Sequence, residues 1–303
     1  HAMPYAIRIH ETGGPEKLKW EEVQVGDPGP GQVRVRNTAI GLNFIDIYQR
    51  SGLYPLPLPF ILGSEGAGVV EAVGPKVKEL KVGDRVAYSG PIGAYAEVLL
   101  RPADRMVKVP AGVDDRTAAA MMLKGLTAQY LIRRTYRVKK GDTILMHAAA
   151  GGVGQILCQW ARHLGATVIG TVGSEEKAAL AKKAGCKHVI VTSKEKFVER
   201  VKAITKGKGV PVVYDGVGKD TFTDSLDCLR PLGVMVSFGN ASGAVTQFNP
   251  GVLAQKGALF LTRPTLIYYT ATREDLLKAA RELFAVVKSG KVKISINQTY
   301  PLR

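Results

Sequence analysis

The stretch that decides the fold is His147-Ala148-Ala149-Ala150-Gly151-Gly152-Val153-Gly154. An apolar run at residues 143–147 leads into it, and a helical pattern at 153–164 follows it. Small residues let the backbone approach a pyrophosphate closely, and the N-terminus of the next helix then faces the negative charge. A second apolar run lies at the spacing expected for a dinucleotide-binding unit. The alternative is a tight structural turn within an α/β fold.

Apolar and helical segments alternate on the C-terminal side of this turn, after an Ala- and Leu-rich helical pattern at 115–131. This alternation predicts a parallel sheet with right-handed crossovers and helices on both faces. The fold class is therefore α/β, with a doubly wound Rossmann domain. The predicted strands are 167–172, 188–191, 212–215, 234–238 and 259–262, and the predicted helices are 175–184, 194–205, 219–229 and 272–289.

The chain before residue 115 has a β character with many turns. Val33-Arg34-Val35-Arg36 alternates apolar and charged residues, as a half-buried strand does. Residues 66–74 and 82–87 predict further short strands bounded by glycine. Residues 55–60 alternate proline with apolar residues, which predicts an extended loop because proline removes helical hydrogen bonds. We expect a small, irregular barrel here.

Composition limits the possible compartments and partners. The 303 residues have a net charge of +16, which suits nucleic acid, an acidic surface or an anionic cofactor. Cys158, Cys186 and Cys228 are odd in number and far apart, so we expect a reducing cytoplasm rather than a disulfide framework. We expect no membrane helix, because no apolar stretch reaches roughly 18–20 residues. We also expect no signal peptide, and His1-Ala2-Met3 reads as an expression-tag remnant.

The end of the second strand discriminates between dinucleotides. An NAD site normally places Asp or Glu there to hold the ribose 2′-hydroxyl, but this chain has Gly173-Ser174. The Ser174 hydroxyl and the Lys177 ammonium can instead bind a 2′-phosphate, which favours NADPH. Residues 174–208 carry ten basic and four acidic side chains around the expected adenosine end. The alternative is a set of solvated helix faces.

Several motifs together resemble the zinc-independent, zeta-crystallin-like NADPH:quinone oxidoreductases of the medium-chain dehydrogenase/reductase superfamily, in their bacterial form. The resemblance covers nearly the whole chain. It implies a GroES-like, irregular β-barrel catalytic domain at 1–124 and 265–303, and a Rossmann domain at 125–264. The motifs that carry it, besides the glycine-rich turn, are residues 41–48, 50–54, 124–127, 213–218, 237–243 and 262–264.

The resemblance also implies chemistry without zinc. Ser64 stands where zinc-dependent relatives have histidine, and no cysteine precedes Cys158, so too few zinc ligands remain and Glu65 reads as structural. The residues expected to line the catalytic cleft are Asn43, Asp46, Tyr48, Tyr54 and Thr127. Those expected along the cofactor are Tyr130, Gly152, Val153, Gly173, Ser174, Lys177, Thr192, Gly216, Phe238, Asn240, Ser242 and Pro264. For Tyr130 and Phe238 the alternative is core packing.

The resemblance implies a homodimer that pairs through the edge strand at 258–262. Relatives also continue for a few tens of residues beyond Leu302, so we expect a truncated or disordered tail. The expected activity is transfer from NADPH to a quinone. Two alternatives stay open: a reductase of enones, alkenals or enoyl thioesters, and an RNA-binding or structural protein of the zeta-crystallin type. The charge of +16 fits RNA electrostatically, but no basic stripe with interleaved aromatics is visible.

Overall fold

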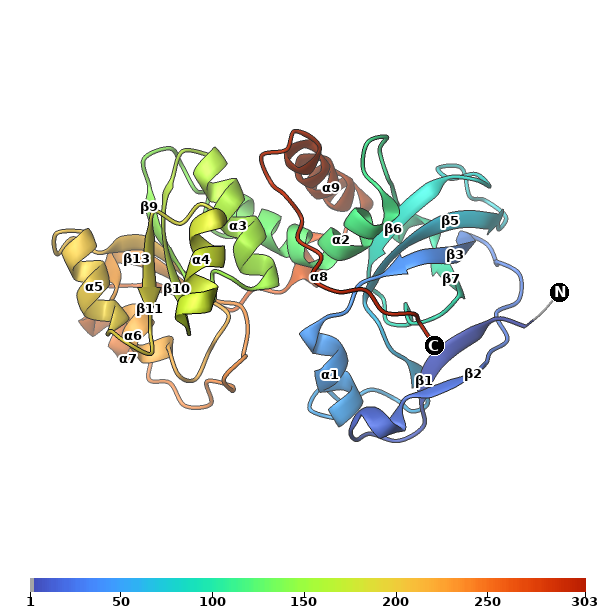
Figure 1. Ribbon diagram of the computed structural model, residues 1–303, viewed down its shortest axis with the longest axis horizontal. Coiled ribbons are helices and arrows are strands. Elements are labelled where there is room, and N and C mark those ends of the chain that lie inside the picture. Colours follow the sequence, from blue (N-terminus) through green and yellow to red (C-terminus); the bar gives the residue numbers. More distant parts are fainter. Residues whose placement is uncertain (1–2) are drawn as a thin grey trace. The chain divides into compact units, whose positions relative to one another are not determined.

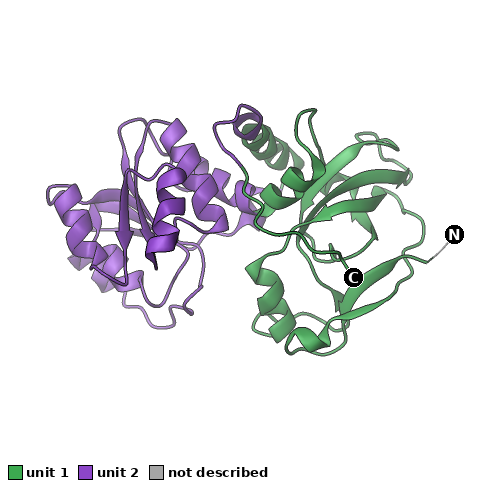
Figure 2. Ribbon diagram, in the orientation of Figure 1, with its two compact units in different colours: residues 1–123, 272–284, 294–303 green, residues 124–271, 285–293 purple. Residues whose placement is uncertain are grey.

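The computed structural model describes residues 3–303, so part of the expected tag remnant lies outside the described residues. The chain forms two compact units (Figure 2). Unit 1 contains residues 1–123, 272–284 and 294–303, and unit 2 contains 124–271 and 285–293. The first boundary lies one residue earlier than predicted, after Leu123. The units also differ from the predicted domains because the chain returns to unit 1 at Thr272 rather than at 265, and because residues 285–293 belong with unit 2. No described helix is both long and apolar enough to cross a membrane.

Unit 1 is built on two antiparallel sheets with strand orders β2-β1-β4 and β7-β3-β5-β6-β8 (Figure 1). In β3 the side chains of Val33 and Val35 are buried and that of Arg36 is exposed, as the alternating sequence predicts. The elements of this part are β1 Tyr5–Ile9, β2 Lys19–Glu22, β3 Gln32–Ile40, α1 Phe44–Ser51, β4 Phe60–Ile61, β5 Glu65–Val73, β6 Arg85–Ser89, β7 Val98–Pro102 and β8 Val107–Lys108, with 3₁₀ turns at Pro15–Lys17 and Ala103–Arg105.

Unit 2 contains a six-stranded sheet with the order β11-β10-β9-β12-β13-β14, in which every neighbouring pair is parallel. Helices α3 and α4 lie on one side of the sheet, and α5, α6 and α7 lie on the other (Figure 1). The elements are β9 Thr143–Met146, α3 Gly152–His163, β10 Thr167–Val172, α4 Glu175–Lys183, β11 His188–Val191, α5 Phe197–Ile204, β12 Val210–Asp215, α6 Phe222–Leu226, β13 Leu229–Ser237, α7 Gly251–Gln255, β14 Phe260–Thr262 and α8 Leu266–Tyr269.

Two helices extend across the division of the chain into units. Helix α2, Asp115–Tyr130, continues into one π-helical segment, Leu131–Thr135. Helix α9 spans Arg273–Lys288 and carries Asp275 in its first turn and Lys288 in its last. Both placements suit the helix dipole, as the sequence predicts.

Three predicted boundaries and one omission need correction. The helix predicted at 194–205 begins only at Phe197. The helix predicted at 219–229 is short, Phe222–Leu226, because β13 already begins at Leu229. This makes β13 longer at its start than the predicted 234–238. Helix α1 lies within the segment predicted to be irregular β-structure, and no helix was predicted there.

Candidate functional site

The glycine-rich turn connects β9 to α3 at the carboxyl edge of the parallel sheet. Gly151 is the N-cap of α3 and provides no side-chain cap, so the helix N-terminus can receive an external anion. A Cβ at Gly154 would lie 2.3 Å from the carbonyl oxygen of Ala148. Only glycine therefore allows the first turn of α3 to lie this close to the preceding backbone. Gly152 and Val153, both predicted to contact the cofactor, form the start of the helix.

The end of β10 has no carboxylate in line with the strand. Gly173 is exposed, and a Cβ there would meet no atom within 4 Å. Ser174 is the N-cap of α4, and its Oγ accepts a hydrogen bond of 3.4 Å from the backbone nitrogen of Lys177. The Ser174 hydroxyl keeps its own proton to donate. The first acidic residue, Glu175, forms an exposed ion pair of 2.9 Å with Lys194. The Lys177 side chain is exposed.

The loops after β12 and β13 are hydrogen-bonded to each other. A Cβ at Gly216 would lie 3.0 Å from the Phe238 ring, so glycine allows the ring to lie against this backbone. The Ser242 hydroxyl donates to the carbonyl oxygen of Val217 at 2.8 Å and accepts from the backbone nitrogen of Asp220 at 3.0 Å. The carbonyl oxygen of Asn240 accepts from the Gly243 nitrogen. Ser242 therefore maintains the loops, whereas Phe238 and Asn240 are half-buried.

Three other residues expected at the cofactor make internal contacts. Tyr130 is buried, and its ring stacks on that of Tyr269 with the centroids 4.3 Å apart. This arrangement agrees with the core-packing alternative for Tyr130, and burial raises the pKa of its hydroxyl. The Thr192 hydroxyl donates to the carbonyl oxygen of Val172 at 3.2 Å, so its proton is already used within the fold. Pro264 is buried, while Thr127 is half-buried on α2.

Asn43 and Asp46 lie together at the start of α1, and both are buried. Asp46 Oδ2 accepts hydrogen bonds from the backbone nitrogen of Asn43 at 2.9 Å and from the Tyr95 hydroxyl at 2.6 Å. Burial and the neighbouring Asp46 carboxylate raise the pKa of Tyr95, so this hydroxyl keeps its proton. Tyr95 was not predicted as part of the site, and its sequence context carried no signal for it. These contacts give Asn43 and Asp46 a role in holding the start of α1.

Glu65 completes this cluster from β5 and is fully buried. Its Oε1 accepts from Asn43 Nδ2 and its Oε2 from the backbone nitrogen of Leu123, both at 2.8 Å. A Cβ at Gly41 would lie 2.2 Å from Glu65 Oε1, so the carboxyl group occupies the space that only glycine leaves. The partners of Glu65 agree with the structural role expected for it. Within residues 3–303 no group of three or more His, Cys, Asp or Glu side chains is arranged to hold a metal ion.

Tyr48 and Tyr54 form a tilted aromatic pair whose ring centroids are 5.2 Å apart. Tyr48 lies on α1, and the loop after the helix brings Tyr54 back to it through a backbone hydrogen bond of 3.1 Å. The neighbouring surface of unit 1 is apolar and exposed. It is formed by Leu42, Phe44, Ile47 and Leu53.

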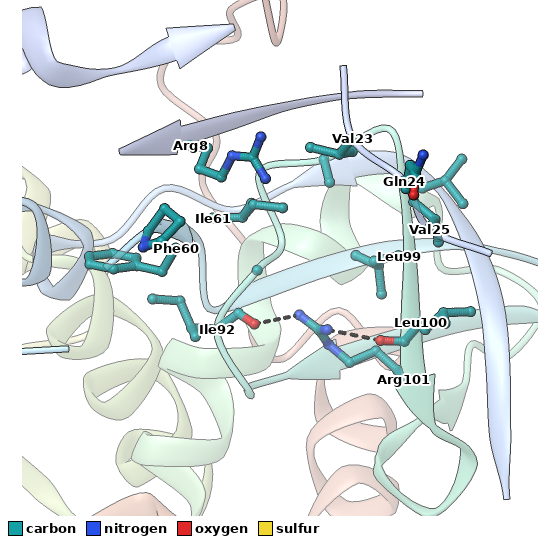
Figure 3. A pocket seen from close by; sticks show the side chains of 14 residues that line it. Arg8, Val23, Gln24, Val25, Phe60, Ile61, Ile92, Leu99, Leu100 and Arg101 are labelled. Carbon is teal, nitrogen blue, oxygen red and sulfur yellow. Dashed lines mark hydrogen bonds between the residues drawn. The ribbon is translucent and has the colours of Figure 1, made fainter. Parts of the chain in front are cut away.

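A cavity of about 370 Å³ in unit 1 contains none of the predicted site residues (Figure 3). It is lined by apolar side chains, including Val23 and Leu99, together with Arg8 and Arg101. The guanidinium of Arg101 donates to the carbonyl oxygens of Leu100, Pro91 and Ile92. Burial lowers the pKa of Arg101. Most of the predicted residues lie in two groups elsewhere, around α1 in unit 1 and at the carboxyl edge of the sheet in unit 2, whereas Thr127 and Tyr130 lie on α2.

Comparisons with known proteins agree with both halves of this fold. Residues 29–111 match the alcohol dehydrogenase GroES-like domain family, and residues 152–284 match the family described as zinc-binding dehydrogenase. A quinone oxidoreductase of Pseudomonas aeruginosa is 56% identical over 302 residues, which cover 99% of this chain and 93% of the relative. A 2-haloacrylate reductase of Burkholderia sp. is 51% identical over 310 residues, with the same shares covered.

A solved structure gives the same result in three dimensions. The crystal structure of Escherichia coli quinone oxidoreductase complexed with NADPH is similar with a TM-score of 0.94 and 52% sequence identity. The match covers 97% of this chain and 90% of that chain. The two-domain fold, the domain matches and identities above 50% over nearly the full length lead to one conclusion. The chain belongs to the quinone oxidoreductase family of the medium-chain dehydrogenase/reductase superfamily.

Proposed function

We propose that this chain is an NADPH-dependent quinone reductase that works without zinc. The observation that carries the proposal is the end of β10, where the half-buried Ser174 provides a hydroxyl, the exposed Lys177 provides an ammonium, and Gly173 stands where an NAD site has a carboxylate. Such donors suit a phosphate on the ribose. The two quinone oxidoreductases named above support a quinone as the acceptor, and the Escherichia coli structure supports NADPH as the cofactor.

The residues present fit a dinucleotide. The uncapped N-terminus of α3 and the close backbone approach at Gly154 form a cradle for a pyrophosphate. Gly173 leaves open space for a 2′-phosphate, because a Cβ there would meet no atom within 4 Å. Ser174 and Lys177 would donate hydrogen bonds to that phosphate. Gly216 and Phe238, which directly follow β12 and β13, would also contact the cofactor.

When bound, NADPH supplies the hydride, and a quinone that receives it together with one proton becomes a hydroquinone. The chain contributes orientation and exclusion of water. In unit 1, Asn43, Asp46 and Glu65 hold the start of α1, and the tyrosine pair Tyr48 and Tyr54 offers hydroxyl donors to the oxygens of the acceptor. The apolar surface beside this pair suits an uncharged ring.

We further propose a cytoplasmic homodimer that pairs through β14. This strand lies at the edge of the sheet, and its Phe260 side chain is 61% exposed. An exposed, apolar edge strand favours pairing with a second copy. Cys158, Cys186 and Cys228 are free thiols, which persist in a reducing compartment. Light scattering of the wild type and of Phe260→Asp tests the dimer: a dimeric variant would contradict this interface.

The loss of NADPH absorbance with a panel of quinones, enones and 2-haloacrylate tests the function. Lys177→Ala should remove one charge-assisted contact of about 1.5–3 kcal/mol, raising KM for NADPH roughly 10- to 100-fold and leaving KM for NADH unchanged. Lys183→Ala, an exposed lysine at the far end of the same helix, is the matched control. Equal effects on both cofactors would contradict the phosphate role. Turnover of 2-haloacrylate but of no quinone would contradict the acceptor class.

A further inference from the structure

His147 is a fully buried titratable group that the proposed chemistry does not use. It directly follows β9, and it lies between the ends of β10 and β12 because those strands flank β9 in the sheet. The strand order also reverses here, since the chain moves from β9 to β10 and β11 on one side and then to β12 on the other. Ligands of doubly wound sheets bind outside this switch point.

The ring of His147 takes part in a continuous chain of hydrogen bonds. Nδ1 lies 2.7 Å from the Thr171 hydroxyl, and Nε2 lies 2.9 Å from the Ser225 hydroxyl. Ser225 donates its own proton to Asp215 Oδ2 at 2.8 Å, so its oxygen accepts from Nε2–H. Nδ1 is then bare and accepts from Thr171. Burial lowers the pKa of His147, which keeps the ring in this neutral state.

Both ends of this series of hydrogen bonds reach backbone at the carboxyl edge of the sheet, where doubly wound folds bind dinucleotides. Asp215 Oδ1 accepts from the backbone nitrogens of Val217 at 2.8 Å and Gly218 at 3.1 Å, which fixes the loop that carries Gly216. At the other end, the carbonyl oxygen of Thr171 accepts from the Ala149 nitrogen at 3.0 Å within the glycine-rich turn.

The turn itself contains a strained residue. Ala148 has a φ of 51°, a left-handed conformation that persists in a residue with a side chain only when its surroundings hold it. Its neighbours on both sides are held: His147 by the ring contacts, and Ala149 by Thr171.

We infer that Thr171, His147, Ser225 and Asp215 form a positioning network that sets the glycine-rich turn and the 215–218 loop in one arrangement for the dinucleotide. None of these side chains needs to touch the ligand, because each acts through the backbone that it holds. The identity of the ligand rests on the proposed function. The network itself rests on the contacts within unit 2.

A matched pair of substitutions tests the network. Thr171→Val removes one hydroxyl from the carboxyl edge of the sheet and leaves Nδ1 of His147 without its donor. Thr205→Val makes the same chemical change after α5, at the opposite end of the strands, where the hydroxyl bonds the Val201 carbonyl oxygen and the Gly209 nitrogen. We expect Thr171→Val to raise the Kd for NADPH, measured by fluorescence titration, at least fivefold. Thr205→Val should lower Tm without changing this Kd.

A second pair addresses the direction of the hydrogen bonds. His147→Gln keeps an N–H that can donate to Ser225, whereas His147→Leu removes it. The Gln variant should keep most of the NADPH affinity that the Leu variant loses, with KM for the quinone unchanged in both. Nitrogen NMR of the wild type should show His147 protonated at Nε2 and bare at Nδ1 from neutral to mildly acidic pH.

The outcomes separate this inference from the proposed function. Unchanged NADPH affinity in Thr171→Val, equal losses in Thr171→Val and Thr205→Val, or a His147 protonated at Nδ1 would each overturn the network. A wild type that binds NADPH yet reduces no quinone would overturn the proposed function and leave the network standing. A wild type without affinity for NADPH would overturn both.

Discussion

Replacing Gly41 by alanine tests the buried cluster around Glu65 most directly. A Cβ at Gly41 would lie 2.2 Å from Oε1, 2.3 Å from Cγ and 2.4 Å from Cδ of Glu65. The carboxyl group would have to move by more than about 1 Å to restore van der Waals contact. The movement would break its hydrogen bonds to Asn43 Nδ2 and to the backbone nitrogen of Leu123, which are both 2.8 Å long.

The size of the effect follows from these two bonds. Leaving a buried polar group without a partner costs about 1–3 kcal/mol, so losing both bonds in Gly41→Ala should lower the free energy of unfolding by about 2–6 kcal/mol. Urea denaturation followed by circular dichroism measures this change. Gly173→Ala is the matched control, because a Cβ there meets no atom within 4 Å. The control should leave stability unchanged or slightly raised, since alanine restricts the unfolded chain.

A double-mutant cycle identifies the cause. Glu65→Ala removes the group that the new methyl would meet, so adding Gly41→Ala to it should cost little more than Glu65→Ala alone. The two substitutions should therefore be strongly non-additive. Additive losses, or a Gly41→Ala protein as stable as the wild type, would refute the argument that Glu65 is what makes glycine necessary at this position.

Three further predictions concern other parts of the molecule. Gly154→Ala should abolish NADPH binding in a fluorescence titration, because its Cβ meets backbone at 2.3 Å, whereas Gly152→Ala should retain affinity, because its Cβ meets only the flexible Lys124 side chain. Tyr95→Phe, which removes one buried hydrogen-bond donor from Asp46 Oδ2, should lower the free energy of unfolding by about 1–3 kcal/mol in urea. Burial lowers the pKa of His147 in the folded state, so the unfolded chain binds the proton first, and stability should fall as pH drops below about 6.5. Denaturation at about pH 7 and pH 5.5 should show less of this fall in His147→Gln.

The Rossmann strands could be predicted because burial on both faces of a parallel sheet leaves continuous apolar runs. The run at 167–172 became β10 with the same bounds, and 188–191 became β11. The helix predicted at 219–229 begins later than expected, at Phe222, and the cause is not visible in the local sequence. Asp215 holds the backbone nitrogens of Val217 and Gly218 and the Thr221 hydroxyl, and this loop delays the helix to Phe222.

Helix α1 was missed because its apolar and polar residues lie on the reverse of the usual faces. It buries Asp46 and exposes Phe44 and Ile47, so the apolar positions that normally mark the core side of a helix lie on its outer face. Such an inversion is costly unless the buried carboxylate has donors, and the Asn43 nitrogen and the Tyr95 hydroxyl provide them.

The resemblance places Asn43, Asp46, Tyr48 and Tyr54 in one catalytic group, but the structure divides them into two pairs with different contacts. Asn43 and Asp46 direct their polar atoms into unit 1, toward Glu65 and Tyr95, so their substitution should change stability and the position of α1 together. Tyr48 and Tyr54 carry hydroxyls that are not needed for this cluster. The exposed apolar residues Phe44 and Ile47 on the same helix would suit the acceptor-binding role proposed for these two tyrosines. Sequence motifs can identify all four residues as a group, but only the hydrogen bonds in the structure distinguish Asn43 and Asp46, which hold α1, from the two tyrosines proposed to meet an acceptor.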